Sequence, residues 1–102
     1  MTARLVILYG HPDDAAAFED YYASTHIPYA VKHMPNVRDA QNSRVVELAD
    51  GSRAPYYRVS QMSYDDLAAL RAGIESEDGR STIADLANFA TGGATLLVVE
   101  DD

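Results

Sequence analysis

Two mostly apolar runs lie near the ends of this 102-residue chain, Ala3–Tyr9 (ARLVILY) and Ala94–Val99 (ATLLVV). Neither run alternates apolar and polar positions, as a strand with one solvent-facing side would. The first run ends at Gly10, and the second follows Gly92 and Gly93. We therefore predict a strand near each end of the chain, with apolar side chains on both of its faces.

A helical pattern follows the first strand. Pro12, Asp13 and Asp14 are typical of a helix start, since proline is tolerated in a first turn and carboxylates favour the positive end of the helix dipole. Downstream, aromatic and histidine side chains recur at three- or four-residue spacing, which places them on one helical face with polar tips. This face comprises Phe18, Tyr22, Thr25 or His26, Tyr29 and His33.

Pro28 interrupts this helical pattern. Because proline lacks an N–H group, it cannot continue a helix without the loss of a hydrogen bond. We predict a break near Ser24–Ile27, followed by a second short helix that Ser24 or Thr25 caps. His26 would lie at the elbow between the two helices.

Two further strands are predicted in the middle of the chain, over Val37–Leu48 and Pro55–Met62. Asp50 and Gly51 lie between them, and this dipeptide suits the positive φ angles of a tight hairpin turn. We therefore expect the two strands to pair as a hairpin.

A second helical region lies between this hairpin and the last strand. Ser63–Asp66 has the form of a capping box with Asp in place of Glu, and it precedes a segment whose leucines and isoleucine share one helical face. The polar stretch Ser76–Ser81, centred on Gly79, predicts that this helix is interrupted before its pattern resumes.

The predicted order of elements is β-α-β-β-α-β, which we assign to one α+β domain over residues 1–102. With right-handed connections this order gives the ferredoxin-like plan, a four-stranded antiparallel sheet with helices on one face. The open face and the edge strand Ala94–Val99 would then expose apolar side chains to water. We therefore predict a homodimer in which a second copy covers them.

The charge and composition of the chain argue against several classes of partner. A net charge of −8 and scattered basic residues oppose binding to nucleic acid and to anionic membranes. The absence of cysteine excludes disulfides and thiolate metal sites. The first apolar run is too short for a signal peptide or a membrane span, so we expect a cytoplasmic protein.

The best single candidate for chemistry is His26. An imidazole can accept a proton from carbon or oxygen near neutral pH, and Tyr22, four residues earlier, could hold a substrate oxygen. Spacing alone also allows His26 to cap the helix break or to bind a backbone carbonyl group. His11 and His33 lie too far along the segment to converge with His26 as ligands, so we predict no metal site.

Several aromatic residues are candidates for the wall of an apolar pocket in which hydroxyl groups orient a ligand. They are Tyr9, Phe18, Tyr22, Tyr57 and Phe89. A core position without a ligand explains them equally, and we favour the core for Phe18 and Phe89, while two or three of the tyrosines are expected to reach the pocket. No phosphate-binding glycine loop or nucleotide fingerprint is present, so no cofactor is predicted.

Two separate stretches of the sequence resemble the EthD family, which is named for ethyl tert-butyl ether degradation. The first stretch is LYGHPDD through STHIP and KHMPNV, and its matching residues are Tyr9, Pro12, Asp13, Phe18, Tyr21, Tyr22, Thr25, His26 and Pro28. The second is SEDGRSTIADLANFATGG, and its matching residues are Asp85, Asn88, Phe89, Gly92 and Gly93. The resemblance spans nearly the whole chain.

This resemblance implies a dimeric α/β barrel, in which two ferredoxin-like sheets pack face to face and each subunit keeps a pocket between its sheet and its helices. It supports His26 as a pocket residue. Asp85 is interpreted from its position as a capping carboxylate, and the resemblance also allows it to pair with His26 or with an arginine in the pocket.

The resemblance is compatible with several kinds of reaction. The EthD protein accompanies an ether-degrading cytochrome P450 system, and similarly folded relatives include muconolactone-type isomerases and cofactor-free monooxygenases. We expect a protein that binds a small hydrophobic or aromatic-derived metabolite in a catabolic or secondary pathway. It would transform this metabolite by cofactor-independent proton transfer, with His26 as the base and Tyr22 or Tyr9 holding the oxygen. The alternative is a non-catalytic ligand-binding or accessory protein of an oxygenase system.

Overall fold

The computed structural model describes all 102 residues, which form four strands and four α-helices. The strands are β1 (Ala3–Gly10), β2 (Asp39–Arg44), β3 (Tyr56–Tyr64) and β4 (Ala94–Glu100). The helices are α1 (Ala15–Tyr21), α2 (Ile27–His33), α3 (Leu67–Glu75) and α4 (Glu77–Ala84). A π-helical turn, Tyr22–His26, joins α1 to α2, and a 3₁₀ turn, Asp85–Asn88, follows α4. None of the helices has the length and hydrophobicity needed to cross a membrane.

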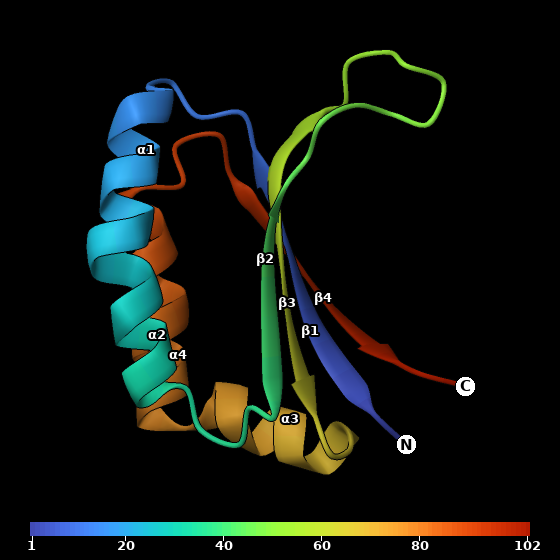
Figure 1. The fold of residues 1–102 in the computed structure, drawn as a ribbon. Coiled ribbons are helices and arrows are strands. Elements are labelled where there is room, and N and C mark those ends of the chain that lie inside the picture. The colour runs from blue at the N-terminus through green and yellow to red at the C-terminus, as the bar shows by residue number, and fades with distance from the viewer.

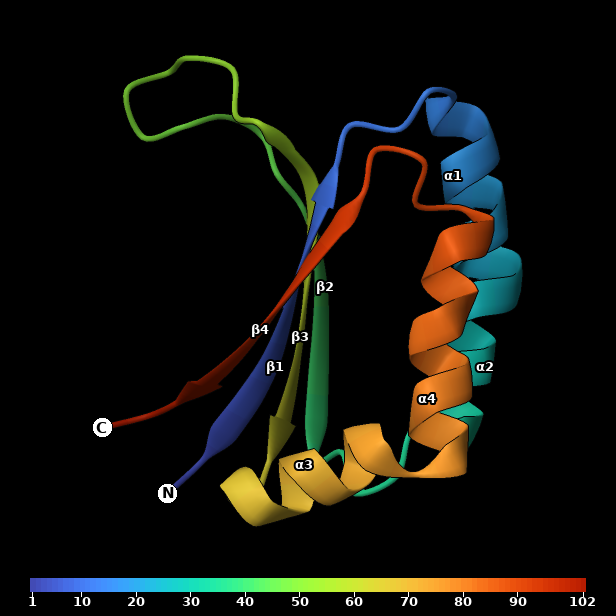
Figure 2. The same cartoon turned by 180° about the vertical axis from the view of Figure 1, so that it is seen from behind.

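The four strands form one antiparallel sheet in the order β2-β3-β1-β4, with β2 and β4 at its edges. Helices α1, α2 and α4 lie on one face of the sheet, and the opposite face carries no helix (Figure 1). Seen from behind, β4 crosses in front of the sheet and the same helices remain on one side (Figure 2). This arrangement confirms the predicted ferredoxin-like α+β fold and the edge position of the last strand.

Strand β1 is central in the sheet, and its alternate residues face the helices. Leu5 and Ile7 are buried on this inner face, whereas Val6 and Leu8 are half-buried on the open face. Apolar residues therefore occupy both faces of the strand, as its sequence predicts. The inner row ends at Tyr9, whose ring packs against aromatic side chains from α1 and the π-helical turn.

The predicted break before Pro28 is absent, because the chain passes through a π-helical turn instead. The Ile27 N–H donates to the Tyr22 carbonyl oxygen, five residues earlier, and the helical path continues into α2. Proline is tolerated here because it occupies the first turn of α2. The predicted caps are also wrong, since the Ser24 hydroxyl donates back to the Asp20 carbonyl oxygen and no side chain caps α2.

Strands β2 and β3 pair as an antiparallel hairpin, as predicted, but both have different ends and the turn is not tight. The regular ladder stops after Arg44, and residues 45–55 form a long loop that projects away from the sheet (Figure 1). Gly51 has a φ of 87° inside this loop, so its predicted backbone conformation is confirmed although the hairpin geometry is not. His11 fixes the base of the loop, because its Nε2 donates to the Ala54 carbonyl oxygen at 2.9 Å.

In the second helical region, both helices begin at a different residue from the one predicted. Asp66, rather than Ser63, caps α3, because its carboxylate accepts a hydrogen bond from the Ala69 N–H. The interruption is confined to Ser76, whose hydroxyl oxygen accepts from the Gly79 N–H and starts α4. The polar residues after Ser76 are therefore helical, since a good N-cap restarts the helix at once.

Gly79 lies where α4 passes against the end of α3, and a Cβ atom at this position would overlap the Gly73 carbonyl oxygen. We expect Gly79→Ala to lower the free energy of unfolding by about 1–3 kcal/mol, because two backbones would have to separate. Urea unfolding followed by circular dichroism measures this difference. Ser81→Ala, at an exposed site on the same helix, should change stability by less than about 0.5 kcal/mol. Equal stability of the two variants would contradict the close contact.

Candidate functional site

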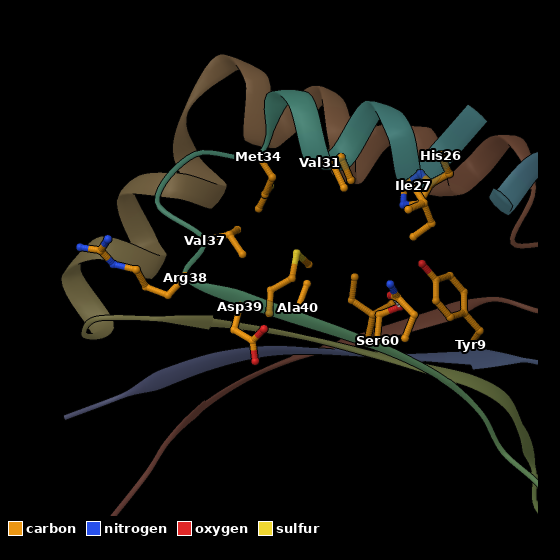
Figure 3. A pocket seen from close by; sticks show the side chains of 14 residues that line it. Tyr9, His26, Ile27, Val31, Met34, Val37, Arg38, Asp39, Ala40 and Ser60 are labelled. Carbon is orange, nitrogen blue, oxygen red and sulfur yellow. Dashed lines mark hydrogen bonds between the residues drawn. The ribbon is translucent and has the colours of Figure 1, made fainter. Parts of the chain in front are cut away.

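A cavity of about 370 Å³ lies between α2 and the inner face of the sheet. Most of its wall is apolar, and the side chains of Val31 and Met34 point into it from α2 while Ala40 points in from β2 (Figure 3). The apolar lining residues are Ile7, Tyr9, Ile27, Ala30, Val31, Met34, Val37, Ala40 and Met62. Val31 is 79% exposed, so the cavity opens to solvent beside α2.

The polar lining residues lie at two separate ends of this cavity (Figure 3). His26, Tyr9 and Ser60 lie together at one end, and Arg38 and Asp39 lie toward the other, where the Arg38 guanidinium pairs with Asp65. Asn42 also lines the cavity and contacts Ser60. We call the end formed by Tyr9, His26, Asn42 and Ser60 the polar end.

His26 is buried, and its Nδ1 lies 2.8 Å from Asp85 Oδ2. Asp85 also accepts hydrogen bonds at Oδ1 from the Tyr21 hydroxyl at 2.7 Å and from Asn88 Nδ2 at 2.8 Å. Burial by itself would raise the pKa of Asp85, but the hydrogen bonds from Tyr21, His26 and Asn88 outweigh it and lower that pKa below its ordinary value. The carboxylate is therefore ionised at neutral pH and can only accept.

The negative charge of Asp85 fixes which nitrogen of the His26 ring donates a hydrogen bond to it. Since the carboxylate only accepts, Nδ1 must donate, and the neutral imidazole then carries its lone pair on Nε2. Nε2 has no hydrogen-bond partner within the chain, and His26 lines the cavity. The pair thus presents a basic nitrogen to a mostly apolar space.

The π-helical turn explains why His26 reaches both the cavity and Asp85. A π turn inserts an extra residue into a helical turn and so rotates the side chains that follow it. The imidazole ring stacks on Tyr22 at a centroid distance of 6.0 Å and contacts Phe89 at 4.7 Å. The imidazole is therefore packed between a ring from the π-helical turn and a ring that follows the 3₁₀ turn.

Tyr22 does not line the cavity itself but supports two residues that do. Its hydroxyl donates to Asn42 Oδ1 at 3.0 Å and lies 2.6 Å from Ser60 Oγ. Arg58 lies over the Tyr22 ring, with its guanidinium carbon 4.9 Å from the ring centroid, and is itself paired with Glu19. Burial raises the pKa of Tyr22, so the phenol stays protonated.

Tyr9 differs from Tyr22, because its hydroxyl is buried without any hydrogen-bond partner. The side chain is 1% exposed, and its oxygen points toward the cavity and α2 (Figure 3). Burial also raises the pKa of Tyr9 strongly, which keeps the phenol a neutral donor. A buried polar group without a partner is costly, and such groups in native proteins call for an explanation.

The structure brings together some of the residues predicted for the site and separates others. Tyr9 and His26 line the cavity, while Tyr22 and Asp85 contact lining residues from behind. Phe18 and Phe89 lie in the buried aromatic core, and the Tyr57 hydroxyl donates to Glu19 outside the cavity. The interpretation of Asp85 as a capping residue is replaced by its pairing with His26. No three His, Asp or Glu side chains converge as metal ligands.

Asn42 and Ser60 are site residues that the sequence reasoning missed. They face each other across β2 and β3, at a register pair of the ladder. Both are polar residues at inward-facing positions, where the neighbouring inward residues Ala40 and Met62 are apolar. A polar pair at inward-facing positions of a predicted hairpin was the available signal, but it required the register, which the tight-turn prediction did not give.

The chain resembles proteins of one family along nearly its whole length. The sequence pattern that defines the EthD domain matches residues 11–93. The "uncharacterized 11.0 kDa protein in thcB-thcC intergenic region" of Rhodococcus erythropolis is 34% identical over 99 residues, which cover 97% of this chain and 94% of that protein.

Solved structures agree with this relationship. An ethyl tert-butyl ether degradation (EthD) family protein of Bacillus halodurans is 30% identical, with a TM-score of 0.88 and 100% of both chains covered. A dimeric ferredoxin-like protein of unknown function from Thermobifida fusca shares the fold at 18% identity, with a TM-score of 0.66 over 99% of this chain and 92% of that one. The match to the family pattern and the two closer relatives confirm the predicted resemblance, and the chain belongs to the EthD family.

Proposed function

We propose that this protein binds a small hydrophobic or aromatic-derived metabolite of a catabolic or secondary pathway and catalyses a cofactor-independent proton transfer on it. The observation that supports the proposal most strongly is the His26–Asp85 pair, which presents Nε2 to the polar end of an otherwise apolar cavity. Small-molecule sites commonly combine an apolar wall with few convergent polar groups. The apolar wall would hold a hydrocarbon or aryl part, and the polar end an oxygen.

The reaction would begin at a carbon atom next to a carbonyl group. His26 Nε2 takes a proton from this carbon, the C–H electron pair forms a carbon–carbon double bond, and the carbonyl electron pair moves to oxygen. Asp85 stabilises the imidazolium that forms, as an acceptor at Nδ1. In a substrate with a second, conjugated carbon–carbon double bond, return of the proton to the far carbon of that bond, as the electron pair on oxygen re-forms the carbonyl group, completes an isomerisation. Tyr9 suits the role of oxygen partner better than Tyr22, because the Tyr22 hydroxyl is already bonded to Asn42 and Ser60.

Replacement of His26 tests the base directly. In D₂O, the wild type should accelerate deuterium uptake by 1-phenylbutan-2-one at the carbons next to its carbonyl group, as measured by proton NMR. His26→Ala should lower this acceleration by about 100-fold or more, because removal of a general base has effects of this order. His33→Ala, on the same helical face, should retain the rate.

Two outcomes would contradict the assignment of His26. Full acceleration by His26→Ala would exclude it as the base. Binding of the ketone by the wild type without any acceleration would instead favour the alternative, in which the cavity carries a ligand and does not transform it.

Asp85 should contribute to stability in a pH-dependent way. Its pKa is lowered in the fold, so the stabilisation is present above the pKa of the unfolded chain and is lost as the pH falls through the folded pKa. We expect Asp85→Asn to lower the free energy of unfolding by about 1–3 kcal/mol at pH 7, since hydrogen bonds to a partly buried charge are lost. The difference from the wild type should shrink below about pH 4, which urea unfolding at several pH values measures. Asp20→Asn, at an exposed site, is the control, and a difference independent of pH would contradict the role of the charge.

We also propose that two copies form a homodimer through the open face of the sheet. Leu97 lies opposite Val6 on this face and is 42% exposed, and Val99 follows it on the same face at 37%. Exposed apolar surface on an edge strand is a common site of association. The Thermobifida fusca protein of the same fold is described as dimeric, which supports the proposal by analogy.

A charge on the open face should separate the two copies. We expect Leu97→Asp to reduce the mass in solution from twice 11.1 kDa to 11.1 kDa, as measured by light scattering after gel filtration. Ala16→Asp adds the same charge to the exposed side of α1 and should leave the dimer intact. A monomeric wild type, or a dimeric Leu97→Asp variant, would contradict this interface.

A further inference from the structure

The polar end of the cavity presents two hydrogen-bond donors that no group of the chain accepts from. The first is the Tyr9 hydroxyl, which is buried, protonated and without a partner. Its ring is fixed by edge-on contacts with Phe18 and Tyr22 at centroid distances of 5.4 and 5.8 Å. Because the ring is held by packing, the hydroxyl cannot turn away to find another acceptor.

The second donor is the amide nitrogen of Asn42. Its Oδ1 accepts hydrogen bonds from Tyr22 at 3.0 Å and from Ser60 at 2.8 Å. These two hydroxyl groups orient the amide, since its oxygen faces them and its Nδ2 is turned elsewhere. Nδ2 has no partner within the chain, and Asn42 lines the cavity. The network behind Asn42 thus fixes the amide through its oxygen and leaves the Nδ2 donor free at the exposed edge strand.

Resting on the proposed function, we propose that Tyr9 Oη and Asn42 Nδ2 form an oxyanion-binding pair, and that the substrate class is an enolisable carbonyl compound with an apolar tail. The carbonyl oxygen binds between the two donors, and it becomes negatively charged when His26 removes the proton from carbon. Donors that are in place before the reaction stabilise the developing charge, because they need no reorganisation as it forms.

This arrangement separates the proton acceptor from the oxygen donors. His26 is on the helical side of the cavity, whereas Tyr9 and Asn42 belong to β1 and β2 of the sheet. A substrate between them exposes a C–H bond to the helix and its oxygen to the sheet. Deprotonation at carbon therefore places the new charge on the side where the donors lie.

A phenol tests the oxyanion pair without turnover, because its oxygen resembles that of an enolate. The probe is 4-nitrophenol, whose visible absorption reports ionisation, and 4-nitrotoluene is the matched ligand with a methyl group in place of the oxygen. In the wild type, bound 4-nitrophenol should be more ionised than free 4-nitrophenol at the same pH. Affinity for the phenolate follows from titration of this absorption.

Two substitutions remove one donor each. Tyr9→Phe deletes only the unpartnered hydroxyl, so the fold should be at least as stable as the wild type in thermal unfolding. Asn42→Asp keeps an oxygen that accepts from Tyr22 and Ser60 but replaces the donor with an acceptor. Each variant should bind the phenolate roughly 10- to 100-fold more weakly, the loss typical of one hydrogen bond to a charged group. Affinity for 4-nitrotoluene should change less than about threefold.

Ala16→Asp is the matched control for charge, because Ala16 is exposed on α1 and does not line the cavity. It should leave the phenolate affinity nearly unchanged. Retained phenolate affinity in Tyr9→Phe and Asn42→Asp would overturn the oxyanion pair, and so would an equal loss in Ala16→Asp. If 4-nitrotoluene binds normally in these cases, the apolar cavity of the proposed function still stands. If neither ligand binds the wild type, the proposed function itself fails.

Discussion

The hydrogen bond between His26 Nδ1 and Asp85 Oδ2 joins the two irregular turns of the helical layer. One is the π-helical turn between α1 and α2, and the other is the 3₁₀ turn after α4. The geometry of the polar end depends on this contact, because the carboxylate decides which ring nitrogen carries the proton. Tyr21 and Asn88 hold the other carboxylate oxygen, so Asp85 has little freedom to turn. The catalytic proposal thus depends on residues that never reach the cavity.

The sheet contributes rigidity to the same site. Tyr9 is the last inward residue of the central strand, where the Tyr9 ring is enclosed by Phe18, Tyr22 and Phe89. Leu5, Ile7 and Tyr9 form the buried row of β1, so a one-residue shift in register would move them to the open face of the sheet. A hydroxyl on such a strand keeps its position whether or not a ligand is present. The aromatic residues predicted for the pocket therefore serve it mainly as packing around Tyr9.

The sequence was sufficient to predict the order of the elements and the position of His26 at the irregular turn between two helical segments, because apolar runs and helical spacing are local signals. It was not sufficient where contacts between residues distant in the sequence determine the structure. Pro28 indicates an irregularity in the helix, but a break and a π-helical turn are equally compatible with the local sequence. Only the continuation of the chain into α2 distinguishes them. Asp85 was assigned to a cap because its partner is 59 residues away. The pairing of Asn42 with Ser60 could be predicted only from the register of β2 against β3. The long loop between the two strands does not determine this register.

The polar end has donors but no free cation, and this limits the kind of ligand that it can select. Arg58 is paired with Glu19 and Arg38 with Asp65, while the net charge of the chain is −8. A permanent anion would therefore meet an unfavourable field and no compensating charge as it enters. In the proposed reaction, a neutral carbonyl compound enters without this penalty and becomes negative only after His26 has taken its proton. Neutral donors then favour the charged intermediate over the ground state, which is the condition for catalysis and not merely for binding.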